Sequence, residues 1–221
     1  MERPINLQEW FGGIDIYLFD QLLKGRFVPG MRVLDAGSGS GRNLVYFLRS
    51  GYEVFGVDES GPQITQLRQM ASALAPHLPA ENFRVELVER MSFGSVANSR
   101  QPTVDSQRRT GVGFDVVISS AVLHFARDEQ QWQAMVNEMW RVLKPGGIFF
   151  ARLASTIGIE NQVRPIEGRR YHLPDGSDRF LVDEAMLQRV TAALGGDFLE
   201  PIKTTVVENM RAMTTWVVKK K

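Results

Sequence analysis

The sequence predicts an α/β fold, a three-layer sandwich in which helices cover a mostly parallel, seven-stranded sheet that ends in an antiparallel C-terminal hairpin. Two observations predict it. Between Arg32 and Leu153, short apolar runs alternate with longer segments of helical periodicity, which is the pattern of a parallel sheet flanked by helices. Near the C-terminus, only residues 208–211 separate two β-rich runs. That link is too short for a crossover helix, so the two runs should pair antiparallel.

Five apolar runs predict the parallel strands. They are Arg32–Ala36, Glu53–Val57, Phe83–Val88, Asp115–Ser119 and Ile148–Leu153. The fourth run is almost continuously apolar, as expected for a strand that is buried on both faces. Ile202–Val207 and Met213–Val218 are the predicted hairpin strands, and the whole arrangement is Rossmann-like.

Residues of helical spacing lie between these strands. The predicted helices are Gly41–Arg49, Gln63–Leu74, residues 128–143 and Asp183–Leu194. Asp128 and Gln131 resemble a capping pair at the start of the third helix, which Lys144–Gly147 (KPGG) ends. We interpret the Trp and Met residues along this helix as core packing. Residues 154–178 are predicted to be irregular.

Composition excludes several classes of function. The 221 residues include no cysteine, which excludes disulfides, thiolate nucleophiles, cysteine-bound zinc and iron–sulfur clusters. A net charge of +1 provides no broad positive field for nucleic acid, and no run reaches the ~20 apolar residues of a membrane helix. The three histidines lack metal-ligand spacing. We therefore expect a cytoplasmic protein without metal, membrane or nucleic-acid partners, of undetermined oligomeric state.

A glycine-rich turn, Gly37–Gly41 (GSGSG), joins the first strand to the first helix. Glycine allows positive φ and the close approach of a ligand, and the helix start presents unpaired N–H groups. Asp58 ends the next strand, seventeen residues beyond Gly41, where a carboxylate accepts hydrogen bonds from the hydroxyls of a ribose. The pattern indicates a cofactor that contains adenosine.

The acid before the turn favours one such cofactor. A dinucleotide fold usually carries G-x-G-x-x-G, with a pyrophosphate at the helix start. This chain has G-x-G-x-G, and Asp35 precedes Gly37 by two residues. An acid there would repel a pyrophosphate but suits the ammonium group of a methionine moiety, directly or through water. The turn therefore points to S-adenosyl-L-methionine (SAM); the other interpretation of Asp35 is a cap that accepts bonds from the amides of the turn.

Four motifs, in the order in which they occur, resemble those of class I SAM-dependent methyltransferases. They are VLDAGSGSG (33–41), VFGVD (54–58), FDVVISSAVLHF (114–125) and RVLKPGGIFF (141–150). More loosely, GRN (41–43) and GYEV (51–54) are similar to the tellurite-resistance type of small methyltransferase. The resemblance implies transfer of a methyl group from SAM, with S-adenosyl-L-homocysteine as the product.

On this basis we expect one methyltransferase domain, residues 1–221, because single cores grow to about 250 residues. Residues 1–30 would form an N-terminal lid, residues 31–153 the SAM-binding core, and residues 154–221 a substrate-side loop, a helix and the hairpin. Gly94–Gly113 is polar and longer than the ~12–15 residues of an ordinary connection. We predict that it is a mobile surface insertion.

The resemblance implies roles for individual residues around the turn. Gly37, Ser38 and Gly39 would line the methionine and ribose, and Asp58 would hold the ribose hydroxyls, with Glu59 beside it. Asn43 would either contact the cofactor or brace the turn.

The resemblance also implies two contacts further along the chain. Glu89, Arg90 and Met91 match the loop that reads the adenine edge and covers its ring, although many relatives have Asp at the position of Glu89. The carbonyl of Ser119, at the end of the fourth strand, would face the methionine ammonium.

His124 is the candidate general base. It follows the fourth strand, at the carboxyl edge where open α/β sheets bind ligands. Its other interpretation is a hydrogen-bonded wall residue that shapes the pocket. A base is required only for a protonated acceptor, because the sulfonium of SAM already activates the methyl group.

Candidate acceptor-binding residues lie outside the core. Tyr17 belongs to an N-terminal segment of helical spacing that would either close over the methyl group or cover the sheet edge. Arg152 and Arg170 belong to an arginine-rich stretch, and arginine binds carboxylates through two N–H groups. They indicate an acidic small substrate, unless neighbouring acids pair with them internally.

We thus predict a methyltransferase that acts on a small molecule. The alternatives are a nucleic-acid methyltransferase, a SAM- or nucleotide-binding module without catalysis, and an NAD-dependent oxidoreductase. Balanced charge and the sequence Ser119–Val122 (SSAV), in place of the N-P-P-Y of amino-group DNA methylases, disfavour the first alternative.

Overall fold

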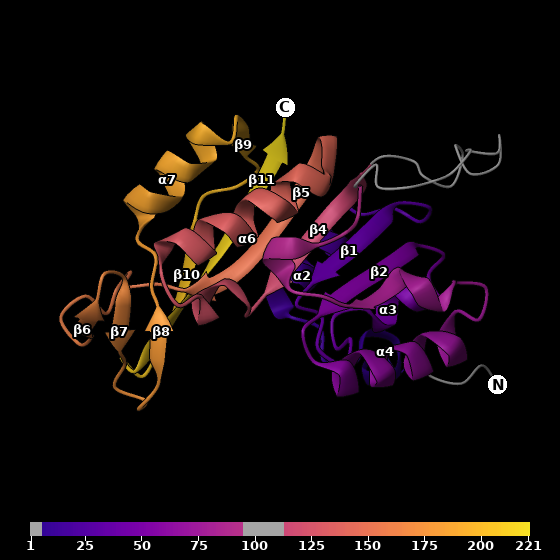
Figure 1. The fold of residues 1–221 in the computed structure, drawn as a ribbon, viewed down its shortest axis with the longest axis horizontal. Helices are drawn as coiled ribbons and strands as arrows, with labels where there is room; N and C mark the ends of the chain where they lie inside the picture. The colour runs from indigo at the N-terminus through magenta and orange to yellow at the C-terminus, as the bar shows by residue number, and fades with distance from the viewer. Residues whose placement is uncertain (1–5, 95–112) are drawn as a thin grey trace.

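A twisted β-sheet forms the centre of the protein (Figure 1), whose computed structural model describes residues 6–94 and 113–221. In spatial order its strands are β10 (Lys203–Val207), β11 (Arg211–Lys220), β5 (Leu143–Ala154), β4 (Phe114–Ser120), β1 (Arg32–Ala36), β2 (Glu53–Asp58) and β3 (Phe83–Val85), with β9 (Gly196–Phe198) also paired to β11. The predicted mobile insertion, apart from its end residues, lies outside the described residues.

The sheet is parallel from β5 to β3 and antiparallel at its C-terminal edge. There β10 and β11 form a hairpin in which Thr204 lies opposite Thr214. Glu208 and Asn209 both have positive φ, as tight hairpin turns that match the strand twist require. The predicted fold class and its C-terminal hairpin are confirmed.

Helices cover both faces of the sheet, because neighbouring residues of a strand point to opposite sides. The helices are α1 (Leu7–Phe11), α2 (Ile16–Leu23), α3 (Val45–Arg49), α4 (Gly61–Leu74), α6 (Glu129–Val142) and α7 (Glu184–Ala193), with single 3₁₀ turns η1 (Ala80–Asn82), η2 (Val88–Arg90) and η3 (Leu123–Phe125). Val33 of β1 packs in the apolar cluster under α2, α3 and α4, whereas Leu34 packs in the cluster under α6 and α7. These clusters make the three layers.

The Trp and Met residues of α6 are core residues, as predicted. Trp132 and Met139 are fully buried, and Trp132 stacks on Trp216 of β11 at a centroid distance of 6.2 Å. Asp128 caps the helix by accepting the N–H of Gln131 at 2.7 Å. The capping pair thus fixes where α6 begins beside the end of β4.

Two strand boundaries differ from the prediction by three residues or more, and α3 begins at Val45 instead of Gly41. β3 ends at Val85 instead of Val88, and the chain then turns into η2. Lys144–Gly147 does not separate α6 from β5 but lies within β5, as an irregularity in its pairing with β4. Leu143 pairs with Phe114 and Ile148 with Val116, so the intervening residues bulge out, with Gly146 at φ +78°.

Residues 164–180 form a small antiparallel sheet where the sequence predicted irregular structure. Its strands are β6 (Arg164–Glu167), β7 (Arg170–His172) and β8 (Asp178–Phe180). Leu173 and Leu181 pack on Ala154, the last residue of β5, in an apolar cluster of their own. The small sheet therefore projects beyond the carboxyl end of β5 (Figure 1).

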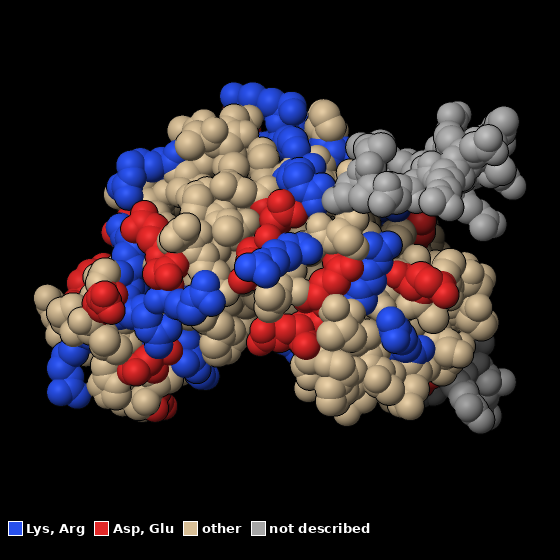
Figure 2. Space-filling model, in the orientation of Figure 1, with Lys and Arg blue, Asp and Glu red and all other residues tan. Residues whose placement is uncertain are grey.

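Charges of both signs are interspersed over the face seen in Figure 2. Within residues 6–94 and 113–221, no helix has the length and apolar content needed to cross a membrane. The same residues include no cluster of three or more histidines and acids that could hold a metal ion.

Candidate active site

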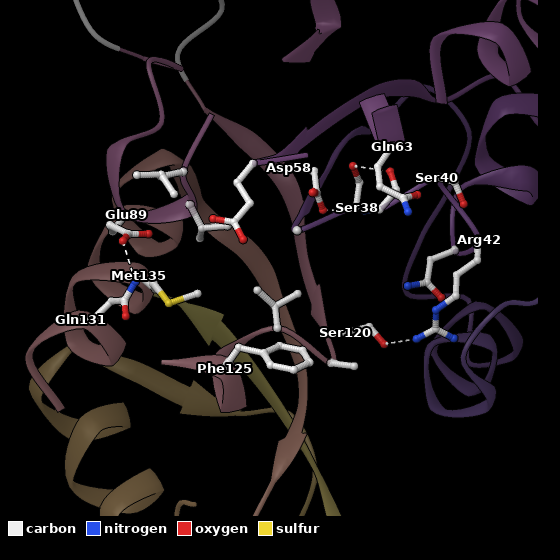
Figure 3. Close-up of a pocket in the computed structure, with 18 residues that line it drawn as sticks. Ser38, Ser40, Arg42, Asp58, Gln63, Glu89, Ser120, Phe125, Gln131 and Met135 are labelled. Carbon is white, nitrogen blue, oxygen red and sulfur yellow. Dashed lines mark hydrogen bonds between the residues drawn. The ribbon is translucent and has the colours of Figure 1, made fainter. Parts of the chain in front are cut away.

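A cavity of about 550 Å³ opens at the carboxyl ends of β1, β2 and β4 (Figure 3). The glycine turn and Asp58 form one wall, and η2, α6 and the turn after β4 form the others. This is the edge at which open parallel sheets bind ligands. The topology therefore brings together residues that lie up to about a hundred positions apart in the sequence.

Backbone packing fixes the glycine turn. Gly37 and Ser38 donate their N–H groups to the carbonyl of Val57 in β2, each at 2.8 Å. Gly37 has φ +83°, and a Cβ there would lie 2.4 Å from Cγ2 of Val122, so only glycine fits. A Cβ on Gly39 would instead meet no atom closer than 3.9 Å, so this glycine faces open space along the cavity.

Asp58 is oriented by two backbone donors. Its Oδ2 accepts the N–H of Gly39 and its Oδ1 accepts the N–H of Ser60, both at 2.9 Å. Each oxygen keeps a further lone pair on the side of the cavity. The carboxylate is thereby held ready to accept bonds from two vicinal hydroxyls.

A wall of apolar side chains around a polar pair, Glu89 and Gln131, closes the end of the cavity opposite Arg42 (Figure 3). Oε1 of Glu89 accepts the side-chain amide of Gln131 at 2.8 Å, and Leu87 and Met135 line the same wall. Apolar side chains can cover the faces of a flat heterocyclic ring, and the polar pair between them can hydrogen-bond to the polar atoms at its edge.

Arg42 and Ser120 form the opposite end of the cavity. Arg42 donates from Nη2 to Oγ of Ser120 at 3.1 Å and from Nη1 to the carbonyl of Gly13 at 3.3 Å. Asn43 also lines this end, and its Oδ1 accepts the N–H of Asp15 at 3.0 Å. Asn43 therefore both faces the cavity and braces the N-terminal segment.

Asp35 lies under this end with its carboxyl group buried. It is 1% exposed, and neither carboxylate oxygen has a hydrogen-bond partner among the described residues. Burial raises the pKa of Asp35 to about 7, against the opposing influence of Arg42 and Asn43. A cationic group of a ligand at this end of the cavity would meet a carboxyl of complementary charge.

Residues 33–147, just over half of the chain, match the methyltransferase domain family. The chain belongs to this family. Class I members of the family use SAM, so the predicted family and its cofactor are confirmed at this level. The orphaned carboxyl of Asp35, the open face of Gly39 and the oriented Asp58 fit that cofactor.

Three known proteins illustrate the similarity. An uncharacterized methyltransferase of Synechocystis is 31% identical over 55% of this chain and 46% of its own length. The tRNA 5-carboxymethoxyuridine methyltransferase of Escherichia coli is 29% identical over 58% of this chain and 42% of its own length. The chain thus spans less than half of the length of these curated relatives.

The third comparison concerns a solved structure. The 1,6-didemethyltoxoflavin-N1-methyltransferase of Burkholderia thailandensis, in complex with S-adenosylhomocysteine, superposes with a TM-score of 0.66 over 98% of this chain and 81% of its own. At 16% sequence identity this likeness establishes the methyltransferase fold alone.

The cavity contains some of the residues that the methyltransferase motifs predicted, and not others. Those that line it are Gly37, Ser38, Gly39, Asn43, Asp58 and Glu59. Asp35, Arg90, Met91 and Ser119 do not: Asp35 and Ser119 are buried beneath it, Met91 packs in the core and Arg90 is exposed. Because β3 ends early, Leu87, Val88 and Glu89 occupy the wall assigned to residues 89–91.

His124 is also set back from the methyltransferase cavity. It is 6% exposed in η3, and its Nδ1 accepts the N–H of Ala154 at 3.3 Å, which leaves the proton of the neutral ring on Nε2. Burial and the charge of Arg179 lower the pKa of His124 to about 4. The geometry favours the interpretation of a wall residue that supports Phe125, which does line the cavity.

The predicted acceptor-binding residues Tyr17, Arg152 and Arg170 do not line the cavity. Arg152 forms an ion pair with Asp15 at 3.0 Å and stacks over the ring of Tyr17, whose hydroxyl bonds Thr205. Arg170 donates to the carbonyl of Ala126, next to η3. Arg152 and Tyr17 thus hold the N-terminal segment against the methyltransferase core.

Sequence reasoning did not assign the cavity contacts of Arg42, Gln63, Ser120 and Phe125. Nothing in the sequence marks Arg42 for the cavity, because a charged residue beside a helix start is usually solvated. Ala121 has φ +63° and turns the chain at the end of β4, so that Ser120 rather than Ser119 borders the cavity. No sequence signal marks such a turn at an alanine.

Proposed function

We propose that this protein transfers the methyl group of SAM to a small-molecule acceptor. One observation carries the proposal: a single cavity combines the glycine turn, an oriented Asp58 and a polar-edged apolar wall in the order that an adenosine and an amino acid require. The predicted residues Gly37, Gly39 and Asn43 line the same cavity.

Each part of the cavity has a role in the proposal. Asp58 holds the ribose hydroxyls, and Glu59 lies at the rim beside it. Glu89, with Gln131, binds the polar edge of the adenine between Leu87 and Met135. The turn from Gly37 to Gly39 supports the methionine part, and the Asp35 carboxyl below balances its ammonium charge.

When bound, SAM would supply an electrophilic methyl group for in-line transfer to a lone pair of the acceptor, and S-adenosyl-L-homocysteine would be the leaving group. The residues of the chain contribute orientation and the exclusion of water. The described titratable residues that line the cavity are Arg42, Asp58, Glu59 and Glu89. None of these is a histidine, the side chain that most often acts as a general base near neutral pH.

The titratable residues that line the cavity indicate which class of acceptor it suits. An acceptor that is already ionised or carries a free lone pair at neutral pH needs no base, whereas a neutral alcohol does. His124, buried and of low pKa, is a weak base at this site. The cavity therefore suits a soft anion, an acid or a neutral amine as the methyl acceptor.

A nucleic acid is the second candidate acceptor, because a curated relative acts on tRNA. Against it, basic and acidic side chains alternate over the face in Figure 2, and the net charge is +1. Phosphate backbones are bound by contiguous Lys and Arg, so this charge pattern favours a small molecule.

The test is a transfer screen with methyl-labelled SAM over pooled thiols, acids, amines, oxyanions and, separately, RNA and DNA. We expect label in at least one small-molecule pool and a loss of that label in the Asp58→Ala variant. Label in RNA or DNA alone would replace the proposal by the second candidate. Binding of S-adenosylhomocysteine without transfer to any pool would indicate a binding module.

A further inference from the structure

The cavity carries opposite charges at its two ends. Glu89 lies at one end of the cavity and Arg42 at the other (Figure 3), and Arg42 is the cationic residue among the described residues that line it. A ligand that fills it therefore meets hydrogen-bond acceptors at one end and a guanidinium at the other. Arg42 is the feature that the proposed adenosine contacts leave unused.

The charge of Arg42 has no close counter-ion in the described structure. Its two hydrogen bonds go to neutral acceptors, Oγ of Ser120 and the carbonyl of Gly13, and no described carboxylate lies within ion-pair distance of it. A guanidinium has five N–H donors, so donors remain for a ligand. The neighbouring Arg152 differs, because Asp15 neutralises it at 3.0 Å.

A bonded network holds the guanidinium of Arg42 in position. Ser120, which accepts from Arg42, donates in turn to Oδ2 of Asp15 at 3.4 Å. The backbone of Asp15 is fixed to Asn43. Arg42 is thus oriented through neutral groups while its charge stays available, which lowers the entropy cost of binding an anion.

Asp35 is the buried acid that acts on Arg42, but its buried carboxyl remains largely protonated at slightly acid pH. It therefore gives Arg42 only partial compensation, and the Arg42 end of the cavity stays positive. A carboxylate is the ligand group that matches a planar, two-pronged donor in geometry and in sign.

We propose that Arg42, oriented by Ser120 and Gly13, binds a carboxylate inside the cavity. The inference rests on the proposed function, which offers two sources of that group: the amino-acid part of the cofactor and an acidic acceptor. Cofactor and acceptor would present the same carboxylate to the guanidinium, so two experiments are needed to distinguish them.

Calorimetry with two probes examines the cofactor source. S-adenosylhomocysteine carries the amino acid, whereas 5′-methylthioadenosine keeps the nucleoside and the thioether but has no carboxylate. If Arg42 binds the carboxylate of the cofactor, Arg42→Gln lowers the affinity for the first probe about tenfold, equivalent to about 1.4 kcal/mol, and leaves the second unchanged. Ser120→Ala removes one hydrogen bond of the guanidinium and lowers the affinity for S-adenosylhomocysteine by less than Arg42→Gln does. In the double variant, Ser120→Ala causes no further loss of affinity beyond that of Arg42→Gln.

Steady-state kinetics examine the acceptor source. If Arg42 binds an acidic acceptor, Arg42→Gln leaves both affinities intact. It then raises KM about tenfold for an acidic acceptor that the transfer screen identifies, but does not raise KM for the methyl ester or amide of that acceptor. Arg49→Gln is the matched control, because Arg49 follows on α3, outside the cavity. It removes the same charge and changes neither readout.

The inference is overturned if Arg42→Gln behaves like Arg49→Gln in both experiments. It is also overturned if both probes weaken equally, since that result marks a general loss of structure. The proposed function fails separately, when the unmodified protein itself binds neither nucleoside and transfers no label.

Discussion

Substitution of Asp35 by asparagine tests the electrostatics of the site most directly, through the pH dependence of stability. The carboxyl is 1% exposed, and burial raises its pKa from 3.8 to about 7 in the folded chain. A raised folded-state pKa means that folding favours the protonated form. The stability that this group contributes is therefore fully present at low pH, and is lost as the pH rises from about 4 to about 7.

The size of the effect follows from the two pKa values. Over that interval the free energy of unfolding falls by about 1.4 kcal/mol per pH unit, or about 4 kcal/mol in total. Between pH 5 and pH 8 the wild type should lose about 2.5 kcal/mol relative to Asp35→Asn, which has no proton to release. The absolute cost of burying the new amide does not enter this difference.

Urea unfolding at pH 5, 6, 7 and 8, followed by tryptophan fluorescence, measures this slope, because Trp132 and Trp216 are fully buried. Asp197→Asn, at an exposed carboxylate of β9, is the control and should keep the wild-type pH dependence. The unfolding free energies of the wild type and of Asp35→Asn can instead change in parallel from pH 5 to pH 8. That result would show that the pKa of Asp35 is not raised in the folded chain.

Three further outcomes are expected. Asp58→Ala should weaken S-adenosylhomocysteine by roughly 1–3 kcal/mol in calorimetry, because an oriented charged acceptor is lost; unchanged affinity would refute its role. Gly37→Ala should lower the free energy of unfolding by about 2–4 kcal/mol, from positive φ plus the clash with Val122, whereas Gly51→Ala, with similar φ and open space, should show only the smaller φ cost in the same urea titration. His124→Gln should leave the pH profile of turnover unchanged above pH 5, since the pKa of His124 is about 4; loss of a limb near pH 6.5 in the variant would show that the histidine titrates in the reaction.

Local sequence signals predicted much of the methyltransferase core. Periodicity identified α4 and α6, since each buries one stripe of apolar side chains on the sheet. The glycine turn and Asp58 were identifiable because positive φ and the end of a parallel strand restrict which residue types fit. These are constraints that a residue meets with its near neighbours along the chain.

Other parts of the cavity depend on where strands stop. β3 ends three residues earlier than its apolar pattern predicted, and so the wall beside Gln131 consists of residues 87–89 instead of 89–91. The small β6–β8 sheet was also missed, because its strands are three or four residues long and, apart from Phe180, exposed or half-buried, and so lack a clear alternation.

The sequence by itself determined the succession of strands and helices along the methyltransferase core, the family and the glycine turn, because these depend on patterns within a few residues. Only the tertiary structure decided that Arg42 faces the cavity without a counter-ion while Arg152 is neutralised by Asp15. The physical reason is distance along the chain. Asp15, Arg42, Ser120 and Arg152 meet through packing of the N-terminal segment on the sheet, and no local pattern records which of the two arginines pairs with Asp15.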